Sequence, residues 1–213
     1  MLYSAPEEAF DRITRLASRL LGVPVALVSL VTEDRQFFKS QQGLPSPWDL
    51  LRQTPLSHSF CQHVVHSGDA LVIEDARTHP LVKDNRAIED LDVVAYLGMP
   101  LKTQDEHALG SLCEIQSTPR QWTPEEQHVL KDLADMVMTE AELRLELKRQ
   151  RILKDELEAR KEQYRSVVEG IRDAVFKTDA AGVLTYVNGA WASITGIPQA
   201  YRRRKRLGSA STR

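Results

Sequence analysis

Cysteine is scarce in this 213-residue sequence, which contains only Cys61 and Cys113. The two stand too far apart for a zinc site, whose cysteines come in closely spaced pairs. Two thiols are also too few for the disulfide framework of a small secreted domain. We therefore expect a cytoplasmic protein with reduced thiols and no bound metal.

Long hydrophobic runs and a strong net charge are also absent. No apolar run approaches the roughly 20 residues that a membrane-spanning helix needs. Residues 1–8 lack the basic and apolar regions of a signal peptide. The formal net charge of −2 gives no general attraction to nucleic acid or anionic lipid. We expect neither a nucleic-acid partner nor a membrane partner.

The histidines do not form a recognisable metal or phosphoryl-transfer motif. His63 and His66 are three residues apart and can share a helix face, but no third or fourth ligand follows at a suitable spacing. His128 is not followed by the acidic residue expected in the phosphoacceptor box of a kinase. No glycine pattern that could cradle phosphate occurs. Surface histidines are the expectation.

One long stretch, residues 123–168, dominates what is present. Thr123, Pro124 and Glu126 form a capping box with proline at the first helical position. Neither proline nor glycine interrupts the rest of the stretch. The pattern predicts one helix of about 45 residues, roughly 65 to 70 Å long at 1.5 Å per residue. A single globular domain cannot bury such a length.

The apolar residues of this helix fall mainly on a heptad, as in a coiled coil. The first seam is interrupted by charge and reads Leu133, Glu140, Leu147, Lys154, Lys161, Val168. The second seam is mostly apolar and reads Met136, Leu143, Gln150, Leu157, Tyr164. We expect a connector that pairs with a second copy of itself, with a solvated helix lying on its own domain as the alternative.

The residues before this helix predict an α+β domain. An amphipathic helix spans 7–21, and strands are expected at 23–31, 36–41, 70–74, 93–101 and 108–116, the fourth broken near Gly98. A proline-containing loop spans 43–55, a short helix 56–65, and weak helical character 85–90. The strands are mostly antiparallel, and we expect the helices on one sheet face.

Residues after the long helix predict a small second region. Strands at 173–178 and 183–187 flank a tight turn, a helix follows at 188–197, and a basic run lies at 202–206. A strand pair and one helix are too little to bury a core. We read the basic run as a solvated tail, although it could bind phosphate.

Residues 7–144 resemble a GAF domain, especially those at the start of bacterial sensor histidine kinases and diguanylate cyclases. The resemblance lies in FDRITRLASRLLGVPVALVSLVTEDRQFFKS, PLSHSFCQHVVHSGDALVIEDARTHPLVKDN and AYLGMPLKTQDEHALGSLCEI. It implies a GAF-like antiparallel sheet with flanking helices. Residues 123–168 then form a signalling helix that overlaps the last helix of the domain.

Residues 163–197 resemble the beginning of a PAS domain, through DAVFKTDAAGVLTYVN and the helix that follows. The chain departs from the PAS pattern after Gly196, which suggests a truncation or a shifted reading frame. Residues 198–213 are expected to be a basic, disordered tail. The resemblance implies a sensor without an output domain, and hence without catalytic activity of its own.

The GAF resemblance implies a ligand pocket between the sheet and residues 56–92. An apolar pocket with a few polar anchors suits a small molecule. For Phe60, Tyr96, Met99 and Cys113, however, ordinary core packing is the favoured interpretation. The candidate lining residues are Phe38, Phe60, Cys61, His63, Asp75, Tyr96, Met99 and Cys113.

Cys61 and His63 leave two other chemistries open. Some GAF relatives attach a linear tetrapyrrole through a cysteine that is often followed directly by histidine. Here His63 stands one residue further on, which disfavours that cofactor, and the ligand stays unknown. Some small GAF enzymes reduce free methionine sulfoxide with cysteines, and an imidazole can activate a thiol. A cysteine-dependent reductase is therefore the alternative to a dimeric signalling module, and a ligand-free dimerisation module is a third.

Overall fold

The computed structural model describes residues 7–198. They divide into two compact units, residues 7–145 and residues 146–198, and helix α5 (Pro124–Gly170) contributes to both. No helix in this range is long and apolar enough to cross a lipid bilayer. Of the tail expected at 198–213, residues 199–213, which include the basic run, lie outside the described residues.

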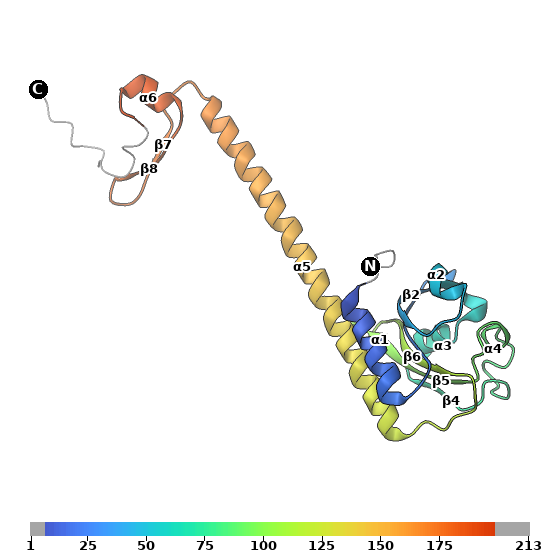
Figure 1. The fold of residues 1–213 in the computed structure, drawn as a ribbon. Coiled ribbons are helices and arrows are strands. Elements are labelled where there is room, and N and C mark those ends of the chain that lie inside the picture. Colours follow the sequence, from blue (N-terminus) through green and yellow to red (C-terminus); the bar gives the residue numbers. More distant parts are fainter. Residues whose placement is uncertain (1–6, 199–213) are drawn as a thin grey trace, which may run out of the picture. The chain divides into compact units, whose positions relative to one another are not determined.

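The first unit is built on one antiparallel sheet of six strands (Figure 1). The strand order is β3-β2-β1-β6-β5-β4, with β1 and β6 at the centre. The strands are β1 (Val25–Val31), β2 (Arg35–Gln42), β3 (Gln53–Pro55), β4 (Leu71–Ile73), β5 (Ala95–Lys102) and β6 (Ala108–Gln116). The expected α+β class with an antiparallel sheet is confirmed.

Each face of the sheet carries its own hydrophobic core. Helix α1 (Glu8–Leu21) and the first part of α5 cover one face, where Leu97 and Leu112 are buried. Helix α3 (Cys61–Ser67), helix α4 (Ala87–Asp90) and their loops cover the other, where Tyr96 and Cys113 are buried. The expectation of helices on a single face was wrong, because alternate residues of β5 and β6 are apolar on both sides.

Three local expectations also need correction. Residues 43–55 are not only a loop: they hold helix α2 (Trp48–Leu51) and edge strand β3, which pairs with β2. The helix expected over 56–65 is divided into a 3₁₀ turn (Leu56–His58) and α3. Strand β5 runs unbroken through Gly98, where a Cβ atom would lie 2.4 Å from the Tyr96 hydroxyl oxygen. The glycine therefore makes room for the tyrosine.

Helix α5 begins with the capping box that the sequence predicts. The Thr123 amide donates to Glu126 Oε2 at 2.7 Å, and the Glu126 amide donates to Thr123 Oγ1 at 3.2 Å. Just before it, Trp122 Nε1 donates to the Ile73 carbonyl at 3.1 Å. These bonds fix the start of α5 on the edge of the sheet that carries β4.

The second unit contains the strand pair β7 (Phe176–Thr178) and β8 (Leu184–Val187), and helix α6 (Ala190–Thr195). Asn188 is fully buried and ties this unit together. Its Nδ2 donates to the carbonyl oxygens of Val168, Ile171 and Asp173, and its Oδ1 accepts from the Val175 amide at 2.9 Å. A small apolar cluster of Leu184, Val187 and Trp191 completes the packing.

Candidate ligand pocket

A small cavity lies in the core that α3 and α4 cover. Its volume is about 20 Å³, enough for about one water molecule. Ligand pockets for drug-sized molecules are some 300–1,000 Å³, so the described conformation is closed. Its lining is mostly apolar and comprises Leu27, Gln36, Phe38, Leu44, His58, Phe60, Cys61, Ala87, Leu91, Val93, Tyr96, Cys113 and Ile115.

Two cysteine thiols and one tyrosine hydroxyl form the polar centre of the cavity lining. Cys61 is the first residue of α3, and its Sγ lies 3.7 Å from Cys113 Sγ on β6. The Tyr96 hydroxyl on β5 lies 3.3 Å from Cys61 Sγ and 3.3 Å from Ser111 Oγ. The side chains of Cys61, Cys113, Tyr96 and Ser111 are all buried. The cluster joins α3 to the neighbouring strands β5 and β6.

The environment shifts the pKa values of these groups in opposite directions. Burial opposes ionisation of Cys61, but hydrogen bonds from Cys113, Ser111, Ser29 and Tyr96 favour its thiolate and lower its pKa to about 6. Burial, together with the neighbouring Cys61, holds the pKa of Cys113 well above its usual range. Cys61 is therefore the more nucleophilic of the two thiols.

His58 forms a second polar part of the cavity lining, on the side nearest α4. His58 is almost buried, and its Nε2 lies 2.8 Å from Asp90 Oδ2. Its Nδ1 lies 2.9 Å from Ser57 Oγ, and its ring lies 5.4 Å from that of Trp48. On the adjoining wall, Gln36 Oε1 accepts a hydrogen bond from Ser59. Elements far apart in sequence thus meet around His58.

Five of the eight candidate residues line this cavity: Phe38, Phe60, Cys61, Tyr96 and Cys113.

The other three candidates lie elsewhere. Met99 is buried on the opposite sheet face, among the residues that α1 and α5 cover. Asp75 accepts from Arg77 at 2.6 and 2.8 Å, which lowers the pKa of Asp75. His63 is half-buried on α3, and burial, followed by the charges of His66 and His79, lowers its pKa.

Neither His58 nor Gln36 was predicted from the sequence to line this pocket. His58 was read as a surface histidine, yet it stands in the 3₁₀ turn just before Cys61, where a bend can turn a side chain inward. Its partner Asp90 comes 32 residues later, so no local spacing could link the two. Within residues 7–198, no three His, Cys, Asp or Glu side chains cluster in a way that could hold a metal ion.

The opposite sheet face contains one unusual polar group. Glu114 on β6 is completely buried beside Ala26 and Leu97, and neither carboxylate oxygen has a hydrogen-bond partner among the described residues. Burial holds the pKa of Glu114 well above its usual range, and the positive charge of Arg120 offsets this only in part. A titratable group thus lies in the layer between the sheet and helices α1 and α5.

Comparison with known proteins identifies both units. Residues 5–140 match the GAF domain family, and residues 162–201 match the PAS fold. A cyclic di-GMP phosphodiesterase of Pseudomonas aeruginosa is 32% identical over 121 residues, which cover 56% of this chain and 20% of that protein. The chain thus spans about a fifth of the length of this relative, and the likeness covers only the GAF region.

Solved structures show the same fold for the first unit. The GAF domain of PixJ from Thermosynechococcus elongatus superposes with a TM-score of 0.53 at 21% identity, covering 69% of this chain and 90% of that one. The type II free methionine-R-sulfoxide reductase of Thermoplasma acidophilum gives a TM-score of 0.52 at 11% identity, with 62% and 89% coverage. This chain belongs to the GAF domain family, and a PAS segment follows its long helix.

Proposed function

We propose that this chain is the sensory input part of a signalling protein. Its GAF domain binds a small molecule or a partner surface, and α5 relays the change to the PAS segment and an output domain. The name of the Pseudomonas relative suggests cyclic di-GMP breakdown as one output. Cyclic di-GMP synthesis by a diguanylate cyclase and phosphoryl transfer by a two-component histidine kinase are the other two. The proposal retains the cytoplasmic location expected from the sequence.

This proposal is based on one observation: the cavity and helix α5 lie on opposite faces of strands β5 and β6. On β6, Cys113 lines the cavity, while Leu112 and Glu114 face the layer that contains α1 and α5. A sheet is close-packed on both faces, so a change of packing on one side is felt on the other. The arrangement therefore favours a signal that passes through the sheet.

The closed cavity indicates how a ligand would act. A space for about one water cannot hold a larger molecule until the covering segment from Leu44 to Val93 moves outward. A ligand that binds only the open form shifts the population toward it, by as much as its affinities for the two forms differ. The reductase alternative receives little support from this geometry, because free methionine sulfoxide cannot fit beside Cys61 in the closed form.

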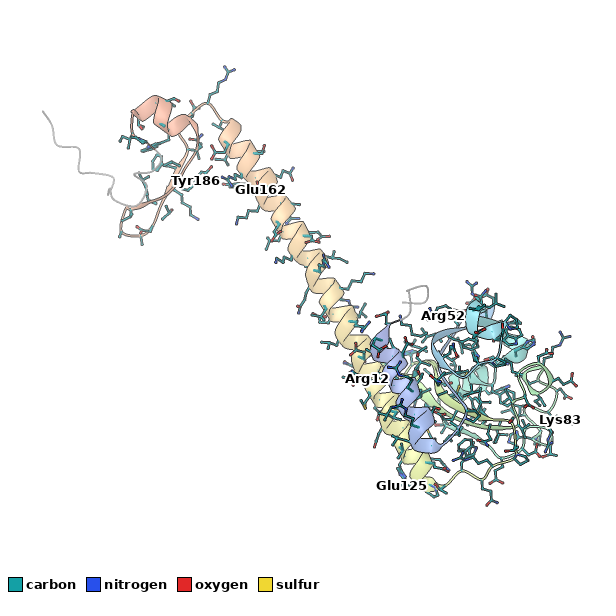
Figure 2. All side chains as sticks on the ribbon, in the orientation of Figure 1. Arg12, Arg52, Lys83, Glu125, Glu162 and Tyr186 are labelled. Carbon is teal, nitrogen blue, oxygen red and sulfur yellow. The ribbon has the colours of Figure 1, made fainter. Side chains whose placement is uncertain are left out.

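The exposed part of α5 supports pairing with a second copy of this chain. Residues 145–167 are exposed without exception, and their side chains line α5 in Figure 2. The second heptad seam leaves four apolar residues at least half exposed: Met136, Leu143, Leu157 and Tyr164. Leu133 and Val168 of the first seam are instead buried in their own units. A parallel partner helix would cover the second seam.

Light scattering tests the pairing directly. We expect the full chain to have twice its monomer mass of 24.1 kDa at micromolar concentration. Changing Leu143→Glu and Leu157→Glu together should return the monomer mass, because like charges would then face each other across the seam. Ile152→Glu is the matched control, since Ile152 is also exposed but lies off both seams. A wild-type monomer at high micromolar concentration would contradict the dimeric relay.

A further inference from the structure

Cys61 and Cys113 are placed as a reactive pair. Their sulfur atoms are 3.7 Å apart, and a disulfide bond needs about 2.05 Å. Closing the remaining gap of about 1.7 Å requires the two side chains to turn about their Cα–Cβ bonds, and α3 and β6 are in contact at this point. The sequence holds no third cysteine, so only one intramolecular pairing exists.

The cavity beside the pair admits one class of oxidant. It is bounded by both thiols and has a volume of about 20 Å³. A molecule of two heavy atoms can occupy such a space, whereas a tripeptide disulfide or an amino-acid sulfoxide cannot. The rest of the lining is mainly aliphatic and aromatic, which keeps larger polar molecules out.

We propose that Cys61 and Cys113 form a reversible disulfide inside the GAF cavity, with hydrogen peroxide as the oxidant. The cavity is then a redox-active site as well as a candidate ligand pocket. The reaction needs neither a bound ligand nor the relay through α5, so it does not depend on the proposed function.

The reaction proceeds in two balanced steps. The Cys61 thiolate attacks one peroxide oxygen, a sulfur–oxygen bond forms, the oxygen–oxygen bond breaks, and the departing hydroxide takes a proton to become water. Cys113 then attacks the Cys61 sulfenic acid, the sulfur–sulfur bond forms, and the Cys113 proton leaves with the sulfenic oxygen as a second water. Two thiols lose two electrons and one peroxide gains them. A dithiol reductant reverses the change by exchange.

The neighbouring groups assign the roles of the two thiols. Tyr96 hydroxyl and Cys113 Sγ both lie within hydrogen-bonding distance of Cys61 Sγ and stabilise its negative charge. Cys61 is therefore the attacking thiol and Cys113 the resolving one. The new bond would join the start of α3 to β6 and remove the hydrogen bond between Tyr96 and Cys61. Oxidation thus alters the same wall that a ligand would contact.

Peptide mapping of the native full chain tests the proposal without any variant. The reduced protein is treated with hydrogen peroxide, remaining thiols are alkylated in denaturant, and the chain is cut with trypsin. Peptides 53–77 and 103–120 each hold one of the cysteines. We expect a disulfide-linked pair of these two peptides, whose mass is two hydrogens less than the summed masses of the reduced peptides. The protein that yields this pair should migrate as a monomer on a non-reducing gel. Treatment with dithiothreitol should separate the two peptides.

Two matched variants test the assigned order. Cys113→Ala should leave Cys61 as a sulfenic acid that dimedone traps, and Cys61→Ala should leave Cys113 unreactive toward the same peroxide dose. Full alkylation of both cysteines after native peroxide treatment would overturn the proposal, as would a disulfide found only between chains. A joined peptide in a protein that proves monomeric would leave this inference standing while the dimeric relay failed.

Discussion

Tyr96 and Leu97 are adjacent on β5, and their buried side chains lie on opposite faces of the sheet. Tyr96 borders the cavity and contacts the Phe60 ring at a centroid distance of 5.3 Å. Leu97 packs in the core that α1 and α5 cover. Any movement of β5 that accommodates a ligand beside Tyr96 also moves Leu97, which gives the proposed relay a physical route.

The substitution Tyr96→Phe should weaken the cluster formed by Cys61, Cys113 and Tyr96, while the aromatic ring at position 96 stays in place. The variant loses hydrogen bonds at 3.3 Å to Cys61 and Ser111, so we expect about 1 kcal/mol less stability in urea unfolding. The pKa of Cys61 should rise from about 6, because one donor to its thiolate is gone. Ultraviolet thiolate absorbance across a pH titration measures this shift. Tyr164→Phe on exposed α5 should change neither quantity.

Glu114 should make the stability of the GAF unit fall as pH rises. Its folded pKa is raised, so its contribution is intact below the pKa of an unfolded glutamate and is lost as pH rises through the folded value. Glu114→Met removes an unpaired buried carboxyl at similar volume, and we expect about 1–3 kcal/mol more stability at neutral pH. The difference should shrink toward pH 4.

Urea unfolding at several pH values measures the Glu114 effect. Glu125→Met on the exposed first turn of α5 is the control and should follow the wild-type pH profile. Parallel pH profiles for wild type and Glu114→Met would contradict the raised pKa of the buried carboxyl.

Asp90→Ala should loosen the segment that covers the cavity. The variant removes the partner that lies 2.8 Å from His58 Nε2. Because the Asp90 side chain is about half exposed, we expect a loss of less than about 1 kcal/mol in global stability. Hydrogen exchange should nevertheless become faster in residues 56–60 and 85–91. The substitution Glu89→Ala, at a neighbouring exposed residue, is the control. Equal hydrogen-exchange rates in the two variants would argue that the contact between His58 and Asp90 does not hold the covering segment in place.

Asn188→Ala should disrupt the PAS segment alone. The side chain donates to three backbone carbonyls and accepts from the Val175 amide, all within the second unit. Leaving such buried groups unpaired costs about 1–3 kcal/mol, which is large for so small a core. We expect residues 171–195 to lose protection in hydrogen exchange while residues 7–140 keep theirs. Ser193→Ala, exposed on α6, is the control, and unchanged protection in Asn188→Ala would contradict this role.

Local patterns predicted much of the secondary structure. The capping box at Thr123 and Glu126 marks the start of α5 correctly, because its bonds join residues only three apart. Strand β6 was expected at the residues where it lies. Edge strand β3 was missed, because its three residues depend on pairing with β2 rather than on their own pattern.

The residues on the two faces of β5 were not separated correctly by the sequence pattern. Tyr96 and Met99 were both assigned to the pocket, although residues three apart on a continuous strand face opposite sides. The expected break at Gly98 concealed this alternation. The break does not occur, because the missing Cβ of Gly98 accommodates the Tyr96 hydroxyl.

The GAF and PAS resemblance, the α+β class and the long helix can all be predicted from the chain alone, because they follow from the order and period of neighbouring residues. Tertiary packing alone brings Cys61 to Cys113 and His58 to Asp90, and it leaves Glu114 without a hydrogen-bond partner among the described residues. These relationships join residues tens of positions apart through strand register and helix packing. No spacing along the chain encodes such contacts, since they exist only after the sheet has formed and both its faces have been covered.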